Sequence, residues 1–87
     1  MRIDQLLKKL MLIKSRSIAK KACDLGLVKI NEKVCKAHSN VFENDIVEYD
    51  LYNIKTRVKI LKIPKGNVSK KNAHEYYEII SRQSLNQ

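Results

Sequence analysis

Positively charged side chains at short spacing are the feature of this sequence with the clearest chemical use. Arg16, Lys20 and Lys21 follow one another closely, and Arg2 and Lys14 precede them. A guanidinium offers several N–H donors in a rigid fork that fits two phosphate oxygens, whereas an ammonium acts as a point charge. The pattern therefore predicts a surface that binds a phosphate-rich anion.

The stretch from Lys14 to Asn31 contains the signals that would hold this cluster on a short helix. Ser15 suits the N-cap, because its hydroxyl can accept a hydrogen bond from a free backbone N–H of the first turn. Gly26 suits the end of the helix, where a left-handed residue is common. One side of this helix is apolar and consists of Ile18, Ala19, Ala22, Cys23 and Leu25. We expect Arg16 to be the central ligand, since the dipole at the helix N-terminus also favours an anion.

A first helix is predicted just before this one, with Asp4 as its N-cap. Its apolar positions recur three and four residues apart and are Ile3, Leu6, Leu7, Leu10 and Met11. Only the short segment 13–15 separates the two helical patterns, so the helices are expected to form a tight hairpin or corner. Such a hairpin would gather the cations Arg2, Lys14, Arg16, Lys20 and Lys21.

The middle of the chain is predicted to form strands. A short strand over 27–31 is followed by a turn at Asn31–Glu32 and a second short strand, and 36–40 is a polar loop. Asn44 is expected in a turn, where it tolerates a positive φ. Residues 46–52 and 54–63 are rich in β-branched and aromatic residues, which predicts two antiparallel strands joined at Asn53.

The last part of the sequence favours a helix. Ser69 suits its N-cap, and the apolar residues on one face are Ala73, Tyr76, Tyr77 and Ile80; residues 81–87 form a polar tail that is expected to fray. The expected fold class is α+β, with two N-terminal helices packed on a small, mostly antiparallel sheet and a short C-terminal helix. A chain of 87 residues is long enough for one small core.

The charge balance also indicates an anionic partner. Lys and Arg number 18 against 9 for Asp and Glu, a formal net charge of +9. The excess lies at the two ends of the chain, and residues 22–50 are net acidic. A codon bias toward Lys is an alternative explanation for part of the count, but it does not account for this acidic middle.

The residues give little evidence for a metal site, a catalytic site or a phosphate-binding glycine loop. Cys23 and Cys35 form no CxxC pair, so they are expected to be small buried residues in the reducing cytoplasm. His38 and His74 have no companions at metal-ligand or catalytic spacing, and no phosphate-binding glycine loop occurs. We therefore expect no catalytic residue, no metal site, no cofactor and no enzymatic activity. Four tyrosines can stack on bases or pack in the core, with packing favoured by their spacing: Tyr49, Tyr52, Tyr76 and Tyr77.

Several of these motifs occur in an order that resembles the RNA-binding domain first described in ribosomal protein S4. Family members read Arg-hydrophobic-Asp near the start, Arg-Ser/Thr-x-Ala-Lys in the second helix, a closing Gly, a Val-x-Ile/Val-Asn-Gly strand and turn, Lys-Ala/Pro-Ser, and Gly-Asp. Over about its first fifty residues, this chain has Arg2-Ile3-Asp4, Arg16-Ser17-Ile18-Ala19-Lys20, Gly26, Val28-Lys29-Ile30-Asn31, Lys36-Ala37 with Ser39 nearby, and Asp45.

The sequence departs from the family pattern at two turns. Glu32 stands where the family has the turn Gly, and Asn44 stands where a Gly precedes Asp45. Asn tolerates the left-handed region whereas Glu does not. We therefore expect the turn at Asn31–Glu32 to differ in type and the following loop to be placed differently.

The resemblance implies an S4-type RNA-binding domain over residues 1–63 and a C-terminal helix and tail over 64–87. It implies phosphate and 2′-OH contacts to structured RNA from Arg2, Lys14, Arg16, Ser17, Lys20, Lys21, Lys36 and Ser39. The chain is similar in size to small stand-alone members, which bind large ribosomal subunits that carry peptidyl-tRNA and assist the C-terminal tailing of stalled chains. The implied partners are then large-subunit rRNA, peptidyl-tRNA and a tailing factor, with the protein cytoplasmic and monomeric when free.

Four alternatives stay open beside this function. One is a heat-shock-type factor that recycles large subunits bound to peptidyl-tRNA, and another is a generic accessory for structured RNA. The domain is also attached to RNA-modifying enzymes, although 87 residues leave no room for a catalytic domain. A basic, amphipathic first helix would also suit a membrane surface, but its apolar stripe is better explained by a core, and no membrane-spanning segment is expected because the run 10–13 is too short.

Overall fold

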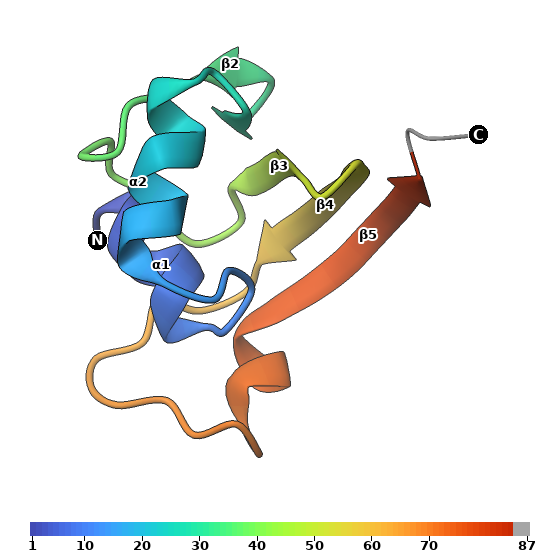
Figure 1. Cartoon of the computed structure of the whole chain (residues 1–87). Coiled ribbons are helices and arrows are strands. Elements are labelled where there is room, and N and C mark those ends of the chain that lie inside the picture. The colour runs from blue at the N-terminus through green and yellow to red at the C-terminus, as the bar shows by residue number, and fades with distance from the viewer. Residues whose placement is uncertain (85–87) are drawn as a thin grey trace.

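Two short helices cover one face of a twisted antiparallel sheet (Figure 1). The computed structural model describes residues 1–84. The helices are α1 (Ile3–Lys9) and α2 (Arg16–Asp24). The strands are β1 (Val28–Ile30), β2 (Lys33–Val34), β3 (Ile46–Leu51), β4 (Ile54–Ile60) and β5 (Tyr77–Ser84), and the 3₁₀ turn η1 (Ala73–Tyr76) precedes β5. The strand order β2-β1-β3-β4-β5 makes one five-stranded sheet, so the α+β prediction with two helices on an antiparallel sheet is confirmed.

The core lies between the helices and the sheet. Helix α1 contributes three fully buried side chains, Ile3, Leu6 and Leu7, and its C-cap residue Leu10 contributes a fourth, as the spacing predicts. The sheet contributes alternate residues, including Val28, Val47 and Val58. Met11 was expected on the same stripe but is exposed, because α1 ends before it and Met11 adopts a left-handed φ of 60°.

Helix α2 begins and ends at the predicted residues. The Ser15 hydroxyl accepts a hydrogen bond from the backbone N–H of Ile18 at 3.2 Å, and Gly26 has a φ of 76°. At the start of α1 the prediction is wrong. Arg2 is the N-cap residue of α1 and makes no side-chain capping bond, whereas Asp4 lies inside the first turn and is buried.

Both tight hairpins use two-residue turns with positive φ at both positions. Asn31 and Glu32 have φ values of 51° and 71°, and Tyr52 and Asn53 have 54° and 61°. This is the backbone of a type I′ turn, whose twist matches the flanking strands. The expectation that Glu32 would change the turn type is therefore wrong: the strand pairing imposes the left-handed conformation on Glu. Asn44 has a φ of 73°, as predicted.

The predicted C-terminal helix is wrong. Only the single turn η1 forms after Ser69 and Asn72, and the chain then extends as β5 along β4. Apolar residues three and four apart fit a helix over so short a window, but Tyr77, Ile79 and Ile80 also suit a strand. Pairing supplies partners for the N–H and C=O groups along the edge of β4.

The described part of the predicted tail, 81–84, is paired in β5, and 85–87 lie outside the described residues. Because β5 adds to the same sheet as β4, the segment after residue 63 packs with the rest of the fold. The boundary at residue 63 stays a prediction.

The two cysteines lie close together, Cys23 in α2 and Cys35 just after β2. Both are free and buried, as predicted. Cys35 contacts the backbone oxygen of Val28 through its Sγ at 3.5 Å. Burial raises the pKa of the Cys23 thiol to about 12, and the neighbouring Cys35 adds to the rise. Burial also raises the pKa of Cys35.

Replacing Glu32 with Gly should stabilise the fold. A non-Gly residue in the left-handed region costs about 1–2 kcal/mol, part of which the greater chain entropy of Gly offsets. We expect Glu32→Gly to raise the free energy of unfolding by about 1 kcal/mol, a shift of roughly 4–8 °C in Tm. Thermal unfolding measures this. Glu32→Gln keeps the strained backbone and loses only the exposed pair with Arg57, so it should stay near wild type; equal gains in both variants would contradict the strain at this turn.

Stability should fall in alkaline solution. The unfolded Cys23 thiol releases its proton near its ordinary pKa of 9.0, whereas the folded thiol keeps it until about 12. The unfolded state thus binds fewer protons in this window, and the free energy of unfolding should decrease as pH rises, by up to about 1.4 kcal/mol per pH unit. Denaturant titrations from pH 8 to 10 would detect this decrease in the free energy of unfolding. Cys23→Ala should show a shallower decline, and an identical slope would exclude this thiol as the cause.

Candidate nucleic-acid interface

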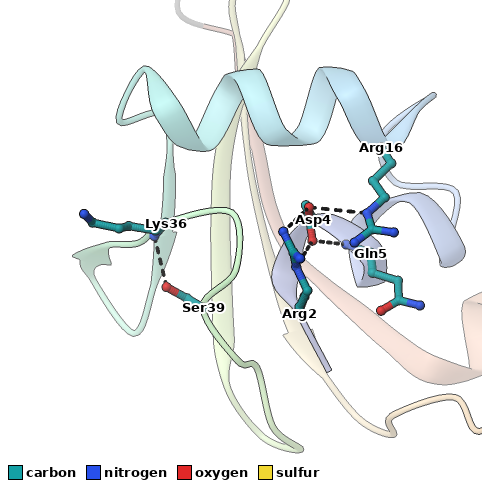
Figure 2. Close-up of polar contacts among 6 residues, drawn as sticks. All are labelled: Arg2, Asp4, Gln5, Arg16, Lys36 and Ser39. Atoms are coloured by element: carbon teal, nitrogen blue, oxygen red, sulfur yellow. Dashed lines mark hydrogen bonds and ion pairs between the residues drawn. The ribbon is translucent and has the colours of Figure 1, made fainter.

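A buried carboxylate joins the two arginines nearest the helix starts (Figure 2). Arg2 donates to both oxygens of Asp4, from Nε to Oδ1 and from Nη2 to Oδ2, each at 3.1 Å. Arg16 donates from Nε to Oδ2 at 3.4 Å. The backbone N–H of Gln5 donates to Oδ1 at 2.8 Å. The Asp4 side chain is 2% exposed, whereas those of Arg2 and Arg16 are 44% and 51% exposed.

This geometry leaves the arginines ready to bind an anion. Arg2 uses Nε and one Nη2 proton on the carboxylate, and Arg16 uses only Nε. Among residues 1–84 the remaining N–H groups of both forks have no partner, so they can meet phosphate oxygens. Both side chains are already held before a ligand arrives. Ordering a long side chain on binding costs roughly 0.5–1.5 kcal/mol, and Asp4 lowers that cost for each arginine.

Lysines extend the charge beyond the arginine pair. Lys20 lies one helical turn after Arg16 and therefore on the same side of α2. Lys20, Lys36 and Arg2 line a common hollow of about 590 Å³. Asp24 lines the same hollow and opposes an anion at that end.

The 36–40 loop is tied to the start of α1 by the backbone. The Ile3 N–H donates to the Ser39 carbonyl at 2.8 Å, and Arg2 forms an isolated antiparallel bridge with Asn40. The Lys36 N–H donates to the Ser39 hydroxyl at 3.0 Å. Figure 2 shows Lys36 and Ser39 beyond the Arg2–Asp4–Arg16 cluster, beside the other end of α2. The Ser39 hydroxyl thus shapes the loop that carries Lys36, and its contact with RNA stays a prediction.

The other predicted ligands are placed less centrally. Ser17 and Lys21 are exposed on the adjacent row of α2, and the Ser17 hydroxyl lies 3.2 Å from that of Ser15. Lys14 is exposed in the α1–α2 connection and lines a different hollow, together with Tyr52 and Arg82. The structure thus joins Arg2 and Arg16 through Asp4 and places Arg2, Lys20 and Lys36 around one hollow, whereas Lys14 lines a different one.

Sequence reasoning missed the part that Asp4 plays in this interface. It assigned Asp4 to a helix cap, whereas the structure places its carboxylate between two guanidiniums from different helices. A signal was present, because Asp4 is the only acidic residue among the first 21, which carry seven cations. A lone carboxylate that is buried among cations is expected to pair with them.

The comparison with protein families decides how this interface is classified. The model of the S4 domain matches residues 1–47, which span α1, α2, the β1–β2 hairpin and the following loop. The chain belongs to the S4 domain family. The matched part contains Arg2, Asp4, Arg16, Lys20 and Lys36, so the arginine pair and the hollow both lie inside the S4 domain.

Sequence similarity to relatives of this S4 domain protein covers nearly its whole length. The chain is 38% identical over 81 residues to the RQC P-site tRNA stabilizing factor of Streptococcus pneumoniae, covering 93% of this chain and 91% of the relative. It is 32% identical over 85 residues to the protein of the same name from Bacillus subtilis, covering 98% of each.

Solved structures share the fold. Heat Shock Protein 15 of Vibrio cholerae superposes with a TM-score of 0.84 at 21% identity, covering 93% of this chain and 82% of that one. The solution structure of hypothetical protein HP1423 gives a TM-score of 0.80 at 31% identity, covering 95% of this chain and all of the other. These overlaps include the C-terminal part of the S4 domain protein beyond residue 47.

Within residues 1–84, no helix has the length and apolar character needed to cross a membrane. No cluster of three or more His, Cys, Asp or Glu side chains in this part of the chain is arranged to hold a metal ion.

Replacing Asp4 with Asn should weaken RNA binding although it makes the protein more positive. The amide cannot accept two charge-assisted bonds as the carboxylate does, so both guanidiniums lose their anchor. We expect the free energy of unfolding to fall by about 1–3 kcal/mol and the affinity for a structured RNA hairpin to fall about tenfold. Denaturant unfolding and fluorescence anisotropy measure the two effects. Glu43→Gln makes the same charge change on an exposed loop and should not weaken binding; a gain in affinity with Asp4→Asn would contradict the anchoring role.

Proposed function

We propose that this S4 domain protein is a non-enzymatic RNA-binding protein that binds rRNA and tRNA on the large ribosomal subunit. There it would assist ribosome-associated quality control, in which a stalled chain still attached to tRNA receives an untemplated C-terminal tail. The observation that carries the proposal is the pair of exposed guanidiniums held by a buried carboxylate at the starts of two helices. Near full-length identity of 32–38% to proteins named RQC P-site tRNA stabilizing factor supports this choice among S4 functions.

Each predicted ligand has a proposed part in binding. Arg2 and Arg16 contact adjacent phosphates of structured RNA through their free N–H groups, because dense backbone charge and shape are what proteins read in duplex RNA. Ser17, Lys20 and Lys21 extend this contact along α2. Lys36, on the loop shaped by Ser39, and Lys14, in the α1–α2 connection, make flanking contacts.

The proposed setting follows from the same function. The partners are large-subunit rRNA, peptidyl-tRNA and the factor that adds the tail, and the protein acts in the cytoplasm. It is proposed to be a monomer when free of the ribosome.

A heat-shock-type recycling factor is the second candidate. Its support is the TM-score of 0.84 to Heat Shock Protein 15 at 21% identity, which is evidence for a common fold. The relatives named RQC factors are more similar in sequence over a comparable length, so the quality-control function is preferred. A membrane-surface function is disfavoured because the apolar stripe of α1 is buried in the core.

Removing the Arg16 guanidinium should weaken binding to large ribosomal subunits. We expect Arg16→Ala to lose about 1–3 kcal/mol, roughly a five- to 150-fold decrease in affinity, through loss of a charge-assisted phosphate contact. The slope of log affinity against log salt should also decrease by about one. Co-sedimentation with purified large subunits carrying peptidyl-tRNA, at several salt concentrations, measures both.

Lys70→Ala is the matched control for this experiment. It also removes one exposed cation, but from the segment between β4 and η1 outside the interface. It should leave the affinity near that of the wild type. Unchanged co-sedimentation of Arg16→Ala, or an equal loss in both variants, would argue against a specific site at Arg16.

A further inference from the structure

A second hollow lies where the α1–α2 connection faces the β3–β4 hairpin and β5. Its volume is about 260 Å³, slightly below the roughly 300–1,000 Å³ of clefts that hold drug-sized ligands. Lys14 comes from the helix connection, Tyr52 from the turn between β3 and β4, and Arg82 from β5. Space of this size suits one planar ring system with an attached charged group.

The sheet fixes the floor of this hollow. Tyr49 pairs with Thr56 across β3 and β4, and Thr56 pairs with Arg82 across β4 and β5, so the three stand in one row. Tyr49 is buried, and burial raises the pKa of its phenol, so the ring stays neutral. Leu51 and Leu12 complete an apolar surface, against which a flat ring can pack.

Tyr52 is an unusual residue for its position. The residue is 77% exposed, which is the highest value among the large apolar and aromatic residues in 1–84. Its φ of 54° lies in the left-handed region, which Asn or Gly would occupy with less strain. An exposed aromatic ring at such a place contributes little to folding, and its available use is to stack on another flat group.

The charges around the hollow are of one sign. Its described lining includes Lys14 and Arg82 and contains no carboxylate. Within residues 1–84, neither cation takes part in a salt bridge. Two cations without carboxylate partners beside an exposed ring match a nucleotide, which combines a flat base with a phosphate.

We propose that this hollow binds one unpaired RNA nucleotide, with its base stacked on Tyr52 and its phosphate between Lys14 and Arg82. The inference rests on the proposed RNA-binding function and adds a second contact to it. Arg2 and Arg16 hold the paired backbone, whereas this site captures a nucleotide that has left the helix. It also specifies the flanking contact of Lys14, which does not line the common hollow of Arg2, Lys20 and Lys36.

The test compares two RNA hairpins, one blunt and one with a short single-stranded extension. Wild-type protein should bind the extended hairpin about tenfold more tightly, in line with the effect of base stacking on an aromatic ring. Tyr52→Asn should bind both hairpins equally and as the wild type binds the blunt one. Asn removes the ring but suits the left-handed turn, so this variant should keep its fold. Tyr52→Phe keeps the ring and should retain the preference.

A second measurement examines the hollow without a paired stem. Titration of the protein with a short single-stranded oligonucleotide, followed by NMR, should shift the amide signals of Lys14, Tyr52 and Arg82 more than those of Arg2 and Arg16. Absence of these shifts would overturn the inference. Shifts produced by a polyglutamate peptide and not by the oligonucleotide would also overturn it, because the hollow would then accept an acidic protein segment.

The two proposals fail in different ways. If the blunt hairpin binds in an Arg16-dependent manner and the extension adds nothing, the nucleotide site is wrong and the proposed function stands. If neither the blunt hairpin nor ribosomal subunits bind through Arg16, while the oligonucleotide still shifts Tyr52, the proposed function is wrong and the nucleotide site stands.

Discussion

The shared contact of Arg2 and Arg16 with the Asp4 carboxylate is the interaction on which the interface depends. It connects the residue that precedes α1 with the first residue of α2, so one buried group holds the two arginines of the charged surface together. A buried carboxylate is costly unless it is paired, and here the pairing costs the arginines little of their capacity to bind an anion. The same contact therefore serves the fold and the proposed function.

Local features were predictable from the sequence, and features set by distant partners were not. The limits of α2 depend on Ser15 and Gly26, which act within one turn, and they were predicted correctly. Strand β5 was mistaken for a helix because its structure depends on pairing with the free edge of β4, whose residues lie 17 to 30 positions earlier in the chain. Pattern alone cannot show which edge is unpaired.

The site shows the same division between local and distant effects. Type and spacing identified Arg16 and Lys20 as members of a cation cluster, because both lie on one face of one helix. The pairing of Asp4 across two helices, and the separation of Lys14 from the cluster, follow from the tertiary arrangement. Family resemblance led to the correct fold in spite of Glu32, since the hairpin holds Glu in a conformation that its propensity disfavours.

The position of β5 has a consequence for how the protein is made. Seven register pairs join it to β4, and it is the final element of the described chain. Until these residues leave the ribosome, the β4 edge is bare and offers a template to any other extended segment nearby. A chain whose synthesis is interrupted before β5 would thus carry a nearly finished domain with the β4 edge unpaired, and would be prone to self-association.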